Sequence, residues 1–78
     1  MAKDQTLERI ENNFTYHPPF GGQTERYVLM RDEAKKLAIL MVNKAPESRE
    51  LSVALTKLEE AVMWVNAAIA RNEVPMLA

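Results

Sequence analysis

The pattern of hydrophobic and polar positions first picks out a short amphipathic segment at residues 4–14. Leu7, Ile10 and Phe14 recur there at helical spacing, which predicts a short helix with one apolar side and with Asp4 near its start. A helix of this length is not stable alone. Its apolar side is therefore expected to pack either on its own chain or on a neighbouring one.

Residues 15–23 are predicted to form an ordered loop. Pro18 and Pro19 are incompatible with a regular helix, and Gly21 and Gly22 allow a turn with positive φ. Three aromatic side chains are expected to give the loop an apolar packing of its own: Phe14, Tyr16 and Phe20.

The rest of the chain has the pattern of a helical hairpin. Its first helix is predicted at residues 24–43, with Thr24 as the N-cap. The stretch 38–42 is apolar on every side of this helix, so it is expected to be covered on every side. One partner helix in so small a chain does not provide that cover.

The second hairpin helix is predicted at residues 47–72, starting at Pro46 to Ser48, with Ser48 as an alternative cap. Its apolar residues alternate four and three apart in a heptad seam: Leu51, Leu55, Leu58, Val62, Val65 and Ile69. Alanines recur every seven residues beside this seam, which indicates close antiparallel packing within the hairpin and repeated packing between chains. Residues 73–78 are predicted to be a tail. We therefore expect an all-α fold in which residues 1–78 form a single helical-hairpin domain.

Composition points to self-assembly. A chain of 78 residues without Cys has no disulfide, and a domain of this size buries only about 60 % of its unfolded surface. Its 47 % hydrophobic content supplies the surface for a homo-oligomer. The net charge of −1 argues against binding of DNA or RNA polymers. No apolar run approaches a membrane span, and the polar start of the chain is unlike a signal peptide, so a cytosolic protein is expected.

Catalysis receives little support from the sequence. His17 is the only histidine and has no nucleophilic partner in a recognisable motif. No set of ligands with metal-binding spacing and no glycine-rich phosphate loop is present. We expect a protein that is not an enzyme, with no cofactor and no metal.

The loop is the better candidate for ligand binding. Tyr16, held between a helix end and two prolines, could present its ring to a nucleobase. Basic residues follow on the next helix: Arg26, Arg31, Lys35 and Lys36. Arg31 and Lys35 share a face, with Tyr27 one turn before Arg31, and this chemistry suits a nucleotide. The alternative is a Tyr16 ring packed within the loop beside a solvated basic face. For His17, a hydrogen bond within the loop is favoured over ligand binding.

A second candidate lies on the long helix, where Lys57, Trp64 and Arg71 are seven residues apart. A cation, an indole and a second cation in line could hold an anionic aromatic ligand. The favoured interpretation is that Trp64 anchors a contact between subunits.

Several stretches together are similar to a known family: Tyr16-His17-Pro18-Pro19, Glu25-Arg26-Tyr27 with Arg31, Ala34-Lys35-x-Leu37-Ala38, Pro46-x-Ser48-Arg49-Glu50, and the run 54–72. They resemble the small phage and prophage proteins built on the hairpin domain shared by anti-CBASS and anti-Thoeris sponges. The resemblance spans about residues 12–73, and the run 54–72 is its most specific part.

The resemblance implies a non-catalytic sponge that sequesters cyclic oligonucleotide second messengers in the cytoplasm of the infected bacterial host. The implied ligands are cyclic dinucleotides such as cyclic GMP-AMP, with cyclic trinucleotides as further candidates. The implied assembly is a compact helical homohexamer with pockets between protomers. By resemblance, Tyr16 stacks on a base, and either Arg31 or Lys35 meets the phosphates. His17 and Arg26 join the candidate ligand-binding set.

Candidates for a second, trinucleotide pocket are Thr56, Asn66 and Arg71. Two other functions stay open. One is a helical assembly or scaffold protein that binds another protein. The other is a sponge for the cyclic ADP-ribose isomers of Thoeris signalling, although the branch with that ligand carries extra sequence before the hairpin.

Overall fold

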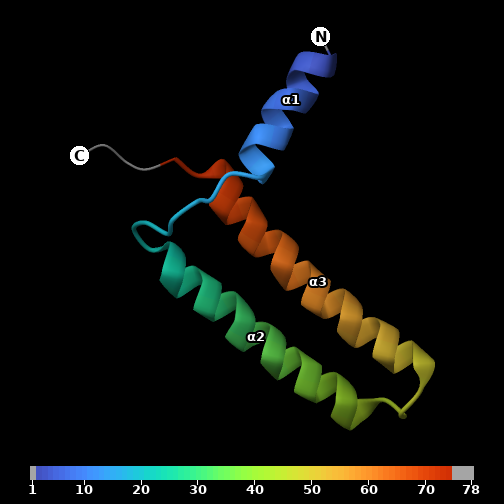
Figure 1. Ribbon diagram of the computed structural model, residues 1–78. Helices are drawn as coiled ribbons and strands as arrows, with labels where there is room; N and C mark the ends of the chain where they lie inside the picture. The colour runs from blue at the N-terminus through green and yellow to red at the C-terminus, as the bar shows by residue number, and fades with distance from the viewer. Residues whose placement is uncertain (1, 75–78) are drawn as a thin grey trace.

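The computed structural model describes residues 2–74, which form three helices and no strand, so the expected all-α class is confirmed. The helices are α1 (Ala2–Asn13), α2 (Gln23–Lys44) and α3 (Arg49–Asn72). Helices α2 and α3 lie side by side and antiparallel, and α1 projects from the end of the hairpin where α3 ends (Figure 1). Most of the predicted tail, residues 75–78, lies outside the described residues. None of the helices within residues 2–74 combines the length and hydropathy needed to cross a membrane.

Helix α2 begins one residue earlier than its predicted start, and Thr24 is not its cap. Gly22 occupies the N-cap position without a side-chain cap bond, and its carbonyl accepts from the backbone N–H of Arg26 (3.2 Å). The reason is Gln23, whose side-chain oxygen accepts from the backbone N–H of Phe20 (3.2 Å). This bond folds the loop back onto the helix, so Gln23 itself joins the first turn.

Helix α3 has the alternative start that the sequence offered. The Oγ of Ser48 accepts from the backbone N–H of Leu51 (3.1 Å), and Ser48 itself is extended. The helix therefore begins at Arg49, so Pro46 and Glu47 precede it and do not belong to its first turn. Side-chain capping of this kind satisfies a backbone donor that has no partner inside the helix.

The described residues bury no hydrophobic side chain; Gln23, 1 % exposed, is the buried residue among them. The heptad seam is half-buried against α2, except for Val65, which is exposed. In the apolar stretch 38–42, Ile39, Leu40 and Val42 are each about half exposed (52, 51 and 51 %). A single partner helix covers one side of α2, and the remaining apolar surface faces solvent in one chain. The sequence analysis expected this apolar stretch to be buried on every side, and the other residues of the same chain do not bury it.

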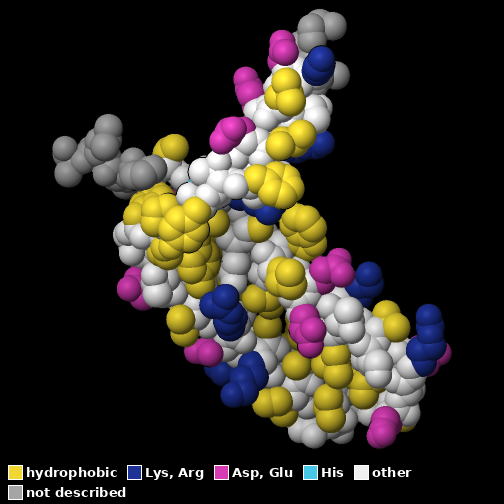
Figure 2. Space-filling view, in the orientation of Figure 1, with side chains coloured by type: hydrophobic (Ala, Val, Ile, Leu, Met, Phe, Trp, Pro, Cys, Tyr) yellow, Lys and Arg dark blue, Asp and Glu magenta, His cyan; other side chains and the backbone are white. Residues whose placement is uncertain are grey.

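The apolar side of α1 is also uncovered. Leu7, Ile10 and Phe14 are exposed, and Figure 2 shows hydrophobic side chains along this helix as well as on the hairpin. Hydrogen bonds of Asn12 and His17 help to tie the end of α1 to the rest of the chain. The side-chain amide of Asn12 donates to the backbone carbonyl of Arg71 (2.9 Å), and Nε2–H of His17 donates to the carbonyl of Asn12 (2.7 Å).

Candidate functional site

Polar bonds, rather than aromatic packing, hold the loop between α1 and α2. Phe14 and Tyr16 are 86 and 79 % exposed, so the apolar packing expected within the loop is absent there. His17 fixes the first half of the loop through its bond to Asn12, the role favoured for it from the sequence. Gln23 fixes the second half through Phe20, and Gly21 turns the chain at a φ of +55°. The Tyr16 ring therefore projects from a loop that is anchored on both sides.

A cleft of about 410 Å³ opens where the loop meets α2 and α3; we call it the loop cleft. It gathers several predicted binding residues: Tyr16, His17, Arg31, Asn66 and Arg71. The loop supplies Tyr16 and His17, α2 supplies Arg31, and α3 supplies the other two. Residues far apart in the sequence thus line one space that combines an aromatic ring, two guanidinium groups and a carboxamide.

The charge of the loop cleft is positive. Arg31 and Arg71 both line it, and among residues 2–74 neither has an ion-pair partner. Arg71 lies over the ring of Trp64, with 6.0 Å between the guanidinium carbon and the ring centroid. Two cations without carboxylate partners near an exposed aromatic ring suit an anionic ligand with flat bases.

Asn66 contributes a further polar group to the loop cleft. Its side-chain oxygen is buried and has no hydrogen-bond partner in the described structure. Two residues with small side chains, Ala67 and Ala70, line the cleft beside Asn66 on α3. A buried acceptor without a partner is uncommon in a folded protein. The sequence suggested Asn66 and Arg71 for a separate pocket, whereas they share a cleft with Tyr16.

Arg26 lies outside the loop cleft and is engaged elsewhere. Its guanidinium meets the Glu73 carboxylate through two bonds, Nη1 to Oε2 (2.5 Å) and Nη2 to Oε1 (2.7 Å). Gln23 donates to the same carboxylate (3.0 Å). Hydrogen bonding from Arg26 and then from Gln23 lowers the pKa of Glu73 to about 2, and the bond to Glu73 raises the pKa of Arg26. This ion pair joins the start of α2 to the end of α3 and leaves Arg26 poorly placed for a phosphate.

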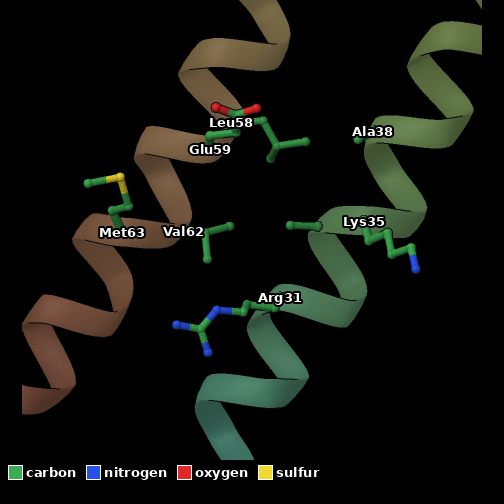
Figure 3. A pocket seen from close by; sticks show the side chains of 8 residues that line it. Arg31, Lys35, Ala38, Leu58, Glu59, Val62 and Met63 are labelled. Carbon is green, nitrogen blue, oxygen red and sulfur yellow. The ribbon is translucent and has the colours of Figure 1, made fainter.

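Lys35 and Thr56 are not in the loop cleft either. Lys35 lines a separate groove between α2 and α3, where Arg31 forms one end and Val62 faces α2 (Figure 3). Thr56 is exposed on α3. Of the two cations considered for the phosphates, Arg31 is therefore the one that shares a cleft with Tyr16.

Trp64 does not line the loop cleft but a neighbouring hollow, which residues of α1 also line. Trp64 is 62 % exposed and lines this hollow of about 350 Å³ together with Arg9 and Arg71. Lys57, the third member of the predicted line, pairs with Glu60 instead (3.8 Å). Of the three residues predicted to lie in line, Trp64 and Arg71 therefore share the hollow and Lys57 does not. Arg9 of α1 supplies a second cation there.

Tyr27 is a cleft residue that the sequence analysis named beside Arg31 but did not add to the candidate binding residues. It lines the loop cleft one turn before Arg31 on α2. The spacing of four residues between Tyr27 and Arg31 was the available signal.

Within residues 2–74, no group of three or more His, Asp or Glu side chains is placed to hold a metal ion.

Comparison with known proteins identifies one family. The family model described as "Acb2/Tad1, hairpin domain" matches residues 6–70. That range contains the loop and nearly all of the hairpin and of the loop cleft. A search of curated proteins and a search of solved structures found no match.

Proposed function

We propose that the chain, which belongs to the Acb2/Tad1 hairpin-domain family, binds a cyclic dinucleotide in the loop cleft and so blocks CBASS signalling. Family membership makes it a sponge-type binding protein for cyclic oligonucleotides. Binding such a messenger lowers its free concentration, so the effectors that it activates stay off. The proposal goes beyond family membership in three respects: the class of cyclic nucleotide that is bound, the cleft that binds it and the defence system that is blocked.

One observation carries the choice of site: Tyr16, Arg31 and Arg71 line the same cleft. Stacking of a base on the Tyr16 ring and contact of phosphates with the guanidinium groups require these groups within one ligand length. Arg31, rather than Lys35, is our candidate for the phosphate contact. His17 serves as an anchor of the loop that carries Tyr16.

We also propose a homo-oligomer, with six copies as the expected number, acting in the cytoplasm of the infected bacterium. The support is the apolar surface that one chain leaves uncovered, including residues 39–42 of α2 and the side of α1. The loop cleft is an open feature of one chain, and a neighbouring copy would close it around a ligand. Closed pockets give the slow release that sequestration needs.

The test of the site is calorimetric titration with a cyclic dinucleotide. Replacing Tyr16 by Ala should cost about 1–3 kcal/mol of binding free energy, the usual contribution of one stacked base. Tyr16→Phe is the matched control, because it keeps the aromatic ring at the same place in the loop cleft and removes only the hydroxyl group. Arg31→Ala should weaken binding and reduce its dependence on salt, since a phosphate contact is lost. Equal binding by the Tyr16→Ala and Tyr16→Phe variants would refute the site.

The sponge mechanism predicts that the ligand survives binding. A cyclic dinucleotide is incubated with the protein, the protein is destroyed by heat and protease, and the nucleotide is analysed by chromatography. We expect intact cyclic ligand, in an amount set by the protein added. Linear products that increase with time would instead identify a phosphodiesterase.

Cyclic trinucleotides and cyclic ADP-ribose isomers are compared in the same titration. Tighter binding of a cyclic ADP-ribose isomer would move the target from CBASS to Thoeris. Failure of every cyclic nucleotide to stabilise the protein against heat would favour the assembly or scaffold function, because a ligand that binds the folded state raises its stability by mass action.

A further inference from the structure

Helix α1 carries an apolar stripe that its own chain does not cover. Leu7 and Ile10 of α1, with Phe14 directly after the helix, form the stripe, and all three are exposed. Asn12 and His17 tie the end of the helix to the loop and to α3, and from there the helix points away from the hairpin (Figure 1). In this arrangement the stripe does not reach the middle of its own α2 and α3. The surface that covers it has to come from another molecule.

The hairpin has an apolar groove of matching length. The groove holds about 300 Å³ between α2 and α3, and its walls carry Ala34 and Ala38 on α2 and Leu58 and Val62 on α3. The alanines leave space that larger side chains would fill, and Figure 3 shows Leu58 and Val62 directed into that space. The groove extends over seven residues of α2, which is about 10 Å of helix. Leu7 and Phe14 are also seven residues apart.

The charges beside the stripe and the groove are complementary. At about 100° per residue, Asp4 and Glu11 lie close together on one flank of the stripe. Arg31 and Lys35 line the α2 side of the groove, and Glu59 lines its α3 side. The acidic flank of a docked α1 is therefore attracted to α2 and repelled by α3. This difference selects one of the two directions in which the helix can lie.

We infer that the groove between α2 and α3 binds the apolar face of α1 from a second copy of this chain. The inference rests on the self-assembly included in the proposed function and adds the surfaces that make the contact. It also assigns Lys35 to an interface between copies and leaves Arg31 at the junction of the groove and the loop cleft. Docking of a neighbour's α1 covers the apolar surface of both partners.

Disulfide trapping tests the contact directly, because the chain has no native Cys. One tagged chain carries Ile10→Cys and a second, differently tagged chain carries Ala34→Cys, because the middle of the stripe lies opposite the middle of the groove in either direction. The two are unfolded together, refolded and oxidised without ligand. We expect a mixed disulfide, since bridging needs the two Cα atoms within about 7 Å. Gln5→Cys is the matched control, because Gln5 lies on the opposite side of α1 from the stripe and should give little mixed product.

A charge reversal provides an independent arm. Lys35→Glu should raise the protein concentration at which the assembly dissociates by at least tenfold, as measured by light scattering. Lys36→Glu is the control, since Lys36 is the neighbouring exposed lysine and does not line the groove. Glu11→Lys should restore assembly in the Lys35→Glu background.

Equal effects of the Lys35→Glu and Lys36→Glu substitutions, or equal trapping by the Ile10→Cys and Gln5→Cys variants, would overturn the docking. A monomeric wild-type protein would overturn both the docking and the proposed assembly. Nucleotide binding is measured separately on the same wild-type protein, so its failure would be recognised as failure of the proposed function.

Discussion

Replacing Gln23 by Glu changes the hydrogen bonds of the one side chain that is buried among the described residues. The Gln23 oxygen accepts from the backbone N–H of Phe20, and its amide nitrogen donates to the carbonyl of Ile69 (3.4 Å) and to Glu73 (3.0 Å). A Glu side chain keeps the acceptor and loses both donors. It also places a second carboxylate beside Glu73.

The expected loss is at least about 2 kcal/mol in the free energy of unfolding. A buried group left without its hydrogen-bond partner costs about 1–3 kcal/mol. Repulsion from Glu73 and burial of a new charge add to this cost and raise the pKa of the introduced carboxyl. Protonation restores a donor, so the difference from the wild-type protein should shrink as the pH falls.

The assay is urea denaturation followed by circular dichroism, at one fixed protein concentration because the proposed assembly would contribute to the measured stability. The matched control is Gln5→Glu, the same chemical change at an exposed position on α1. The reasoning fails if the Gln23→Glu and Gln5→Glu variants unfold within about 0.5 kcal/mol of each other, the usual range for exposed substitutions.

Two further predictions concern the ends of the hairpin helices. The pKa of Glu73 is lowered from 4.5 to about 2, so its pairing stabilises the fold above pH 4.5 and this contribution is lost as the pH falls toward 2. The wild-type melting temperature should therefore fall more steeply over that range than that of Glu73→Gln. Ser48→Ala removes the cap of α3 and should cost about 1 kcal/mol in denaturation, whereas Ser48→Asp should retain most of the stability.

The hairpin was predictable because its signals are local. The heptad seam of α3 repeats every seven residues, and Ser48 stands before the helix with the residue type that caps prefer. Tyr16 in a proline-fixed loop and Arg31 on the next helix were likewise recognisable from neighbouring residues. The structure places both in the loop cleft.

The features that the sequence did not reveal depend on contacts between distant positions. Thr24 has the residue type of a cap, but Gln23 fixes the start of α2 through bonds to Phe20 and to residues near the end of α3. Arg26 has the pattern of a binding cation, and its partner Glu73 lies 47 residues later. Neither pairing has a periodic signal in the sequence, because each arises only when the hairpin closes.

The lack of a buried apolar side chain within residues 2–74 has a calorimetric consequence. The large positive heat-capacity change of protein unfolding comes from apolar surface that becomes hydrated. In the proposed oligomer, contacts between copies would remove much of that surface from water, so the heat-capacity change would belong chiefly to association. Apolar burial weakens on cooling. The oligomer is therefore expected to be cold-sensitive, and its subunits should separate near 0 °C more readily than at room temperature.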